Sequence, residues 1–158
     1  MKRATTLLFL LFGVLQLSAQ DSFRRNTAYF EILGNGGILS INYERELSKQ
    51  PGFGIHAGIG LGGDKPAIPL GITYLLKIRK SKSFVETGLG ITFGEKYIWI
   101  SKQFNGAAAN PYQMGIFPSV GYRHHTKYGL MWKLIYSPFF SPDRTELAFG
   151  GVAIGWRF

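Results

Sequence analysis

Two features of this chain could do chemistry at first reading, a histidine pair and a glycine-rich run. His124 and His125 are adjacent, and neighbouring imidazoles suggest a metal site. Adjacent side chains on a strand point to opposite faces, however, and no third ligand lies at a characteristic spacing. We therefore interpret the pair as residues that flank a turn, and we expect no metal ion or other cofactor.

The glycine-rich run, residues 58–63, superficially resembles a loop that cradles phosphate. Such a loop must follow a strand and lead into the N-terminus of a helix. Here the glycines fall on one face of a strand, and Pro66 follows them. The run therefore predicts part of a strand rather than a nucleotide site.

A larger set of ionisable side chains alternates with apolar residues along the chain. The set consists of Glu31, Glu44, His56, Lys77, Glu86, Arg123, Lys133 and Arg157. Alternation with a period of two is typical of a strand with two unlike faces. These residues therefore share one face of a set of strands, and the strands must position them.

Eight segments of the chain show this alternation, each about as long as a tilted strand that spans a membrane. We expect strands at 27–35, 38–47, 53–62, 67–78, 84–94, 113–124, 128–137 and 148–158. The sequence thus predicts an all-β fold, an eight-stranded antiparallel up-and-down transmembrane barrel.

The composition of the two strand faces predicts which one meets lipid. One face is apolar, and the other consists mainly of glycine, serine, threonine and isolated charges, whereas the exterior of a soluble barrel is rich in lysine and glutamate. We expect the apolar face to point outward, because eight strands leave an interior that side chains can fill. On the first segment this assigns Tyr29, Glu31 and Leu33 to the interior.

The eight ionisable residues named above then form an interior polar cluster. Charges in so confined a space must pair or hold water, because an isolated buried charge costs several kcal/mol. We expect a salt-bridged plug that fixes strand register, with Arg157 facing Glu44 or Glu86. A proton path or a functional site is the alternative interpretation of the same residues.

The two ends of the chain indicate export. Lys2 and Arg3 precede an apolar stretch at 5–17, and Leu17-Ser18-Ala19 offers a cleavage site. We expect a signal peptide at 1–19 and one barrel domain at 20–158; an uncleaved anchor is the alternative.

The absence of cysteine excludes a lipid-modified cysteine, disulfides and thiolate metal sites. The net charge of +9 comes with no nucleic-acid-binding motif, so we expect no nucleic acid partner.

The final strand carries a family resemblance. Val152, Ile154, Trp156 and Phe158 share one face, and the chain ends on that last aromatic residue. This arrangement resembles small OmpX-like outer-membrane barrels of Gram-negative bacteria. The resemblance implies that Trp156 and Phe158 are an assembly signal read by the barrel-assembly machinery. It also implies periplasmic N- and C-termini and contact with outer-membrane lipid and lipopolysaccharide.

The connections between the predicted strands differ in length in the way that this family implies. The even-numbered connections, 48–52, 79–83 and 124–127, are short, as periplasmic turns should be. The connections 95–112 and 138–146 are longer, as surface loops are, whereas the first, at 34–37, is unusually tight. Candidate contacts of the longest loop with a partner or with lipid head groups are Tyr97, Trp99, Lys102 and Phe104.

The sequence favours a non-enzymatic role, structural or in surface interaction, and identifies no surface partner. Barrels of the lipid A acyl hydrolase or transferase type are one alternative, and a narrow pore is another. A serine should follow the catalytic histidine of such a hydrolase, but Thr126 follows the pair here. His56 is expected near the periplasm, away from the outer leaflet. A soluble secreted barrel is a further alternative.

Overall fold

The computed structural model describes residues 24–61, 66–79, 81–95, 112–142 and 144–158. Its strands are β1 (Asn26–Gly34), β2 (Gly37–Glu46), β3 (Phe53–Leu61), β4 (Ile68–Lys77), β5 (Ser83–Glu95), β6 (Tyr112–His125), β7 (Leu130–Tyr136), β8 (Phe139–Ser141), β9 (Arg144–Glu146) and β10 (Gly150–Arg157). No helix in this part of the chain is long and apolar enough to cross a membrane.

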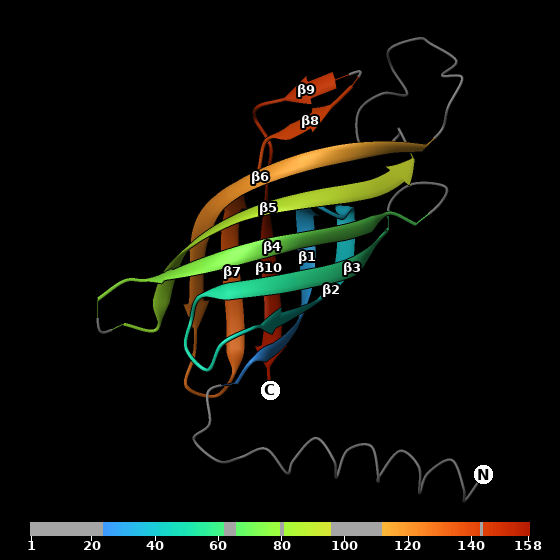
Figure 1. The fold of residues 1–158 in the computed structure, drawn as a ribbon. Coiled ribbons are helices and arrows are strands. Elements are labelled where there is room, and N and C mark those ends of the chain that lie inside the picture. The colour runs from blue at the N-terminus through green and yellow to red at the C-terminus, as the bar shows by residue number, and fades with distance from the viewer. Residues whose placement is uncertain (1–23, 62–65, 80, 96–111, 143) are drawn as a thin grey trace, which may run out of the picture.

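Eight of these strands, β1 to β7 and β10, form a closed antiparallel barrel (Figure 1). Each strand pairs with its neighbours in the sequence, except that β7 pairs with β10 across the β8–β9 hairpin. The ring closes where β10 returns to β1, with Trp156 opposite Ala28 and Ile154 opposite Phe30. The prediction of an eight-stranded up-and-down antiparallel barrel is confirmed.

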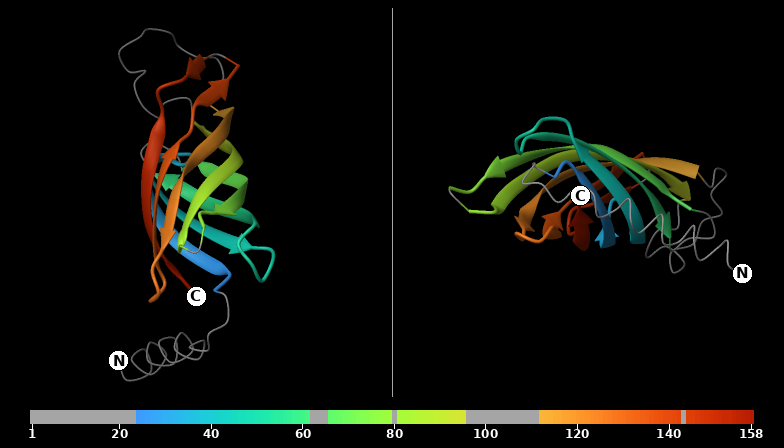
Figure 2. Two further views of the ribbon diagram at one scale, coloured as in Figure 1. Left: turned by 90° about the vertical axis from the view of Figure 1, so that its left-hand side faces the viewer. Right: turned by 90° about the horizontal axis from the view of Figure 1, so that it is seen from below.

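The two ends of the barrel differ in what they carry (Figure 2). Phe158 and the short turns after β2, β4 and β6 lie at one end, which we call the terminus end. The β8–β9 hairpin and the β1–β2 turn lie at the other, the hairpin end. A loop is predicted at 138–146, but the structure forms the hairpin there, with Phe140 of β8 opposite Ile116 of β6.

The two faces of the strands have opposite chemistry. Because successive side chains of a strand alternate in direction, each strand contributes to both faces. Large apolar side chains point outward and are exposed, for example Phe30, Ile41, Ile59 and Ile154. The inward face buries Thr27, Glu31, Ser40, Asn42, Glu44, Glu46, Thr73, Glu86, Thr92, Arg123, His125 and Lys133.

The alternation breaks at Leu33, which the sequence analysis placed inside the barrel. The structure exposes this side chain by 40%. The reason is local, because Leu33 has a left-handed backbone with φ of 55° and the next residue, Gly34, pairs with Gly37 across a two-residue turn. Because the backbone of Leu33 is no longer extended, its side chain points outward, and the prediction of an interior position for Leu33 is wrong.

Candidate functional site

Arg123 is the centre of the charged interior. It lies on β6 and is fully buried. Its Nη1 and Nη2 donate to the two carboxylate oxygens of Glu44 at 2.6 and 2.7 Å, and its Nε donates to Glu86 Oε2 at 2.5 Å. Glu86 lies on the adjacent strand β5, but Glu44 lies on β2, which is not a neighbour of β6. The guanidinium thus crosses the lumen and joins three strands.

Lys133 on β7 extends this network toward mid-barrel. Its Nζ lies 3.3 Å from Glu86 Oε1 and 4.0 Å from Glu31 Oε1. The same ammonium lies 4.3 Å from the centre of the Tyr29 ring, which adds a cation–π contact from β1. The ionic chain therefore runs from Glu44 through Arg123, Glu86 and Lys133 to Glu31, and we call it the central network.

The geometry of the central network offsets the desolvation of its charges. Moving an ion out of water costs several kcal/mol, and only close pairing with further hydrogen bonds repays that. The bidentate Arg123–Glu44 pair is the strongest form of such pairing. Thr73 Oγ1 also donates to Glu44 Oε1 at 3.5 Å. These contacts specify which strands face each other across the lumen.

A second ion pair lies at the terminus end. Arg157 on β10 donates from Nη2 to Glu46 Oε1 at 2.9 Å, and the same nitrogen donates to the carbonyl oxygen of Arg24. The expected partner of Arg157 was Glu44 or Glu86, and this assignment is wrong. Both of these carboxylates are bound to Arg123, whereas Glu46 lies one alternation step nearer the end of the barrel.

Glu46 belongs to the interior, although it was not among the predicted cluster. It is 1% exposed. The signal was available in the sequence, because Glu46 follows Ser40, Asn42 and Glu44 at the same two-residue spacing. The inward face of this strand therefore continues from Glu44 to Glu46, which the predicted cluster did not include.

The histidines divide between the two faces. His56 is buried in the lumen beside Gly71, where a Cβ would overlap its ring. His125 is also buried, and its ring lies 4.7 Å from that of Phe84. His124 instead lies on the outer face, 5.8 Å from the Trp132 ring. The adjacent pair thus points to opposite faces, and the inward His125 is a lumen residue that the sequence analysis did not include.

Seven of the eight predicted interior residues are buried in the lumen, and Lys77 is not. Its side chain is exposed. Lys77 shares a strand face with Thr73 and Leu75, both buried, but it is the last residue of β4. The lumen ends before Lys77, so its side chain is exposed to solvent even though it lies on the inward face of β4. The prediction for Lys77 is wrong for that reason.

At the hairpin end of the lumen, the β1–β2 turn fills the space and is held by hydrogen bonds from hydroxyl side chains. Asn35, in the β1–β2 turn, accepts a hydrogen bond from Ser137 Oγ to its Oδ1 at 3.1 Å, and its carbonyl accepts one from Thr92 Oγ1 at 2.5 Å. Gly90 makes room for the Asn35 amide, because a Cβ there would overlap it. The turn therefore reaches across the barrel to β5 and to the end of β7.

Three phenylalanines complete this end of the barrel. The Phe117 ring lies 4.9 Å from that of Phe139 and 6.1 Å from that of Phe149. They occupy the place where β6 separates from β7, since that pairing ends at Val120 and β6 continues past β8. We call Phe117, Phe139 and Phe149 the aromatic cluster.

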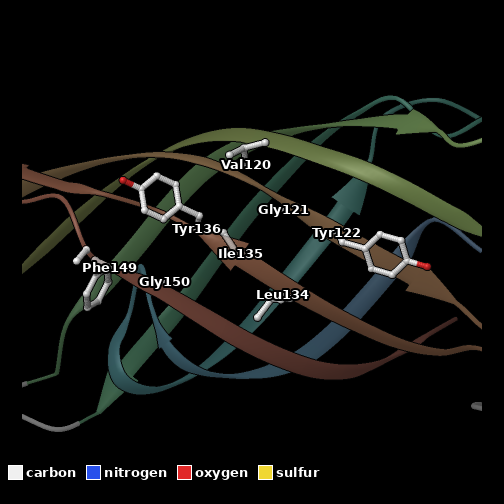
Figure 3. A pocket seen from close by; sticks show the side chains of 9 residues that line it. Val120, Gly121, Tyr122, Leu134, Ile135, Tyr136, Phe149 and Gly150 are labelled. Atoms are coloured by element: carbon white, nitrogen blue, oxygen red, sulfur yellow. The ribbon is translucent and has the colours of Figure 1, made fainter.

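An open groove of about 470 Å³ lies on the outer surface near this separation (Figure 3). Val120, Tyr122, Leu134 and Tyr136 line it together with Phe149. The lining holds no acidic, basic or histidine side chain within the described part of the chain. The lining is therefore mainly apolar, with the hydroxyl groups of Tyr122 and Tyr136 as its polar side-chain atoms.

The predicted assembly signal faces outward. Trp156 is 51% exposed and Phe158 is 40% exposed, and the Phe158 ring lies 6.5 Å from that of Tyr43. The candidate loop contacts Tyr97, Trp99, Lys102 and Phe104 lie outside the described residues.

Comparison of the chain with known families, curated proteins and solved structures gave no match. The resemblance to OmpX-like barrels therefore stays a prediction. What the geometry establishes is a closed barrel with an apolar exterior and a paired ionic interior.

Proposed function

We propose that this protein is an integral outer-membrane barrel, exported by its signal peptide, with a structural or surface-interaction role and no catalytic activity. One observation carries the proposal, the inversion of polarity between the two faces of the barrel. Carboxylates and cations lie inside, and large apolar side chains lie outside.

The extent of the outer apolar surface supports a lipid environment. Ile154, Phe30, Ile41 and Ile59 lie side by side across four strands at mid-height, and each is at least half exposed. Soluble monomers rarely expose apolar patches beyond a few hundred Å². In water, such a continuous belt forgoes about 25 cal/mol for each Å² of apolar surface.

Exposed aromatic residues at the terminus end support the same environment. Besides Phe158 and Tyr43, the rings of Phe53 and Tyr74 lie 4.6 Å apart, and those of Tyr122 and Trp132 lie 5.3 Å apart. Aromatic belts at this position are typical of the interface between membrane and water.

The paired interior favours a closed barrel over a pore. Arg123 and Lys133 occupy the lumen between strands that face each other, and the Asn35 turn occupies the hairpin end. Planar-bilayer recordings should therefore show no stable openings. Well-resolved openings of the wild-type barrel would contradict the closed interior but not the membrane location.

Membrane fractionation tests the proposed location. The protein should stay in the outer-membrane fraction after a carbonate wash, and its gel mobility should shift on heating, because spanning barrels resist detergent until they unfold. A protein that leaves the membrane in carbonate and shows one mobility would contradict the proposal and favour a soluble secreted barrel.

The terminal residue offers a test of assembly. Phe158→Ser should reduce the amount of barrel inserted in cells, because the proposed signal for the assembly machinery is lost. Phe53→Ser is the matched control, since Phe53 is also an exposed aromatic residue at the terminus end. Equal losses from both substitutions would show a general aromatic effect and contradict a terminal signal.

A further inference from the structure

The exposed charged side chains at the terminus end of the barrel are all basic in the described residues. The exposed basic side chains there are Arg45, Lys49, Lys77, Arg79, Lys82 and Lys127. The carboxylates nearest to them, Glu44, Glu46 and Glu86, are at most 2% exposed and are paired inside the lumen. The outer basic side chains are therefore not neutralised by the interior. We call these six residues the basic ring.

The basic ring surrounds the barrel rather than marking one side of it. Arg45 and Lys49 lie at the β2–β3 connection, Lys77 and Lys82 flank the β4–β5 turn, and Lys127 lies in the β6–β7 turn. These connections follow one another around the circumference. A protein partner would contact one arc of this ring, whereas a lipid leaflet encircles a barrel and contacts all of it.

The basic ring lies nearer the end of the barrel than the exposed aromatic residues do, and this order fits the headgroup layer of a membrane. Arg45 and Tyr43 are successive outward residues of β2, with the arginine nearer the end of the barrel. Lys127 Nζ lies 4.8 Å from the centre of the exposed Tyr128 ring. Tyrosine and tryptophan rings lie at the headgroup level, and lysine or arginine beside them reaches phosphates.

The sequences that join β3 to β4, β5 to β6 and β7 to β10 have no excess of positive charge. The segments 62–67, 95–112 and 138–149 contain four acidic and four basic residues. The three short connections that carry the basic ring therefore hold the positive excess.

We propose that the basic ring binds the phosphates of anionic phospholipids in the leaflet at the terminus end. This inference rests on the proposed membrane location. Lysine on a flexible stem acts as a point charge, which suits the mobile phosphates of a leaflet better than one fixed ligand. Each cation near an anionic surface strengthens binding about fivefold, and salt weakens the effect. The ring thus favours insertion into an anionic leaflet and fixes which end faces it.

Folding into vesicles tests this inference. The urea-unfolded chain is diluted into vesicles of phosphatidylcholine alone or mixed with phosphatidylglycerol, and folded barrel is measured by heat-modifiable mobility. Wild-type protein should fold several-fold faster in the anionic vesicles, and added sodium chloride should remove the difference. Equal rates in both vesicles would overturn the basic ring proposal while leaving the membrane barrel intact. No insertion into either would instead count against the proposed function.

A matched pair of variants assigns the effect to the ring. The triple substitution Lys77→Gln, Arg79→Gln and Lys82→Gln should lose most of the preference for anionic vesicles. The control is Lys65→Gln, Lys96→Gln and Lys102→Gln, which removes the same charge from the segments between β3 and β4 and between β5 and β6. The control should keep the preference, and an equal loss would overturn the assignment to the ring.

One further arm separates lipid from free phosphate. Inorganic phosphate should suppress the preference no more than chloride at equal ionic strength. Stronger suppression by phosphate would indicate a discrete anion site and overturn the assignment to lipid.

Discussion

The lumen of this barrel is filled in two different ways at its two ends. Toward the terminus end, Arg123 and Lys133 bind carboxylates from strands that are not their neighbours. At the hairpin end, the Asn35 turn and the aromatic cluster occupy the space instead. The stability of an ion pair depends on the charge of its partner, whereas the stability of packed aromatic rings depends on filling space. Substitutions at the two ends should therefore be compensated differently, by removing the unpaired charge at one end and by restoring side-chain volume at the other.

The largest effect is expected in the central network. Arg123→Met should lower the free energy of unfolding in detergent micelles by about 4 kcal/mol, because it leaves Glu44 and Glu86 buried without their main partner. Denaturant unfolding followed by heat-modifiable mobility measures this loss.

Neutralising the partners tests whether charge or packing causes that loss. Adding Glu44→Gln and Glu86→Gln to Arg123→Met should restore most of the stability, since no unpaired carboxylate then stays behind at these two positions. A triple variant as unstable as Arg123→Met would show that the network acts through packing and would remove the contrast between the two ends.

A smaller effect is expected in the aromatic cluster. Phe117→Ala should lower stability by about 3 kcal/mol through the cavity it leaves beside Phe139 and Phe149. Phe117→Leu should restore much of it, because volume rather than charge is at issue. Phe140→Ala is the control, since this outward residue of β8 is exposed. An equal loss from the control would contradict a packed cluster.

The smallest effect is expected at the β1–β2 turn. Asn35→Ala removes the side-chain hydrogen bond to Ser137 and should reduce stability by about 1 kcal/mol. The backbone bond to Thr92 is retained. Combining Asn35→Ala with Ser137→Ala should cost little more than either change alone. Fully additive losses would mean that the two residues act independently.

The alternation of residue types was enough to predict the strands and most of the interior. The alternating direction of side chains along a strand was enough to predict an inward position for Glu31, Glu44, Glu86, Arg123 and Lys133. The same alternation would also have included Glu46 and His125. It does not show where the lumen ends, which explains the error at Lys77, and it fails where the backbone is no longer extended, as at Leu33.

The pairing across the lumen could not be predicted from the sequence. Arg123 and Glu44 are separated by 79 residues, and their contact depends on the stagger of every strand between β2 and β6. The same stagger brings Arg157 to Glu46 instead of Glu44. The β8–β9 hairpin has strands of three residues each, too short for alternation to identify.

The inversion of polarity is the central claim, and labelling of β2 tests it most directly. The chain has no cysteine, so a single substitution carries a fluorophore to one site. The variants are Ser40→Cys, Ile41→Cys, Asn42→Cys and Tyr43→Cys, with Lys49→Cys as the aqueous control. In vesicles, brominated acyl chains should quench the labels at 41 and 43 but not those at 40 and 42. Iodide quenching at 41 and 43 as strong as at 49 would contradict the account.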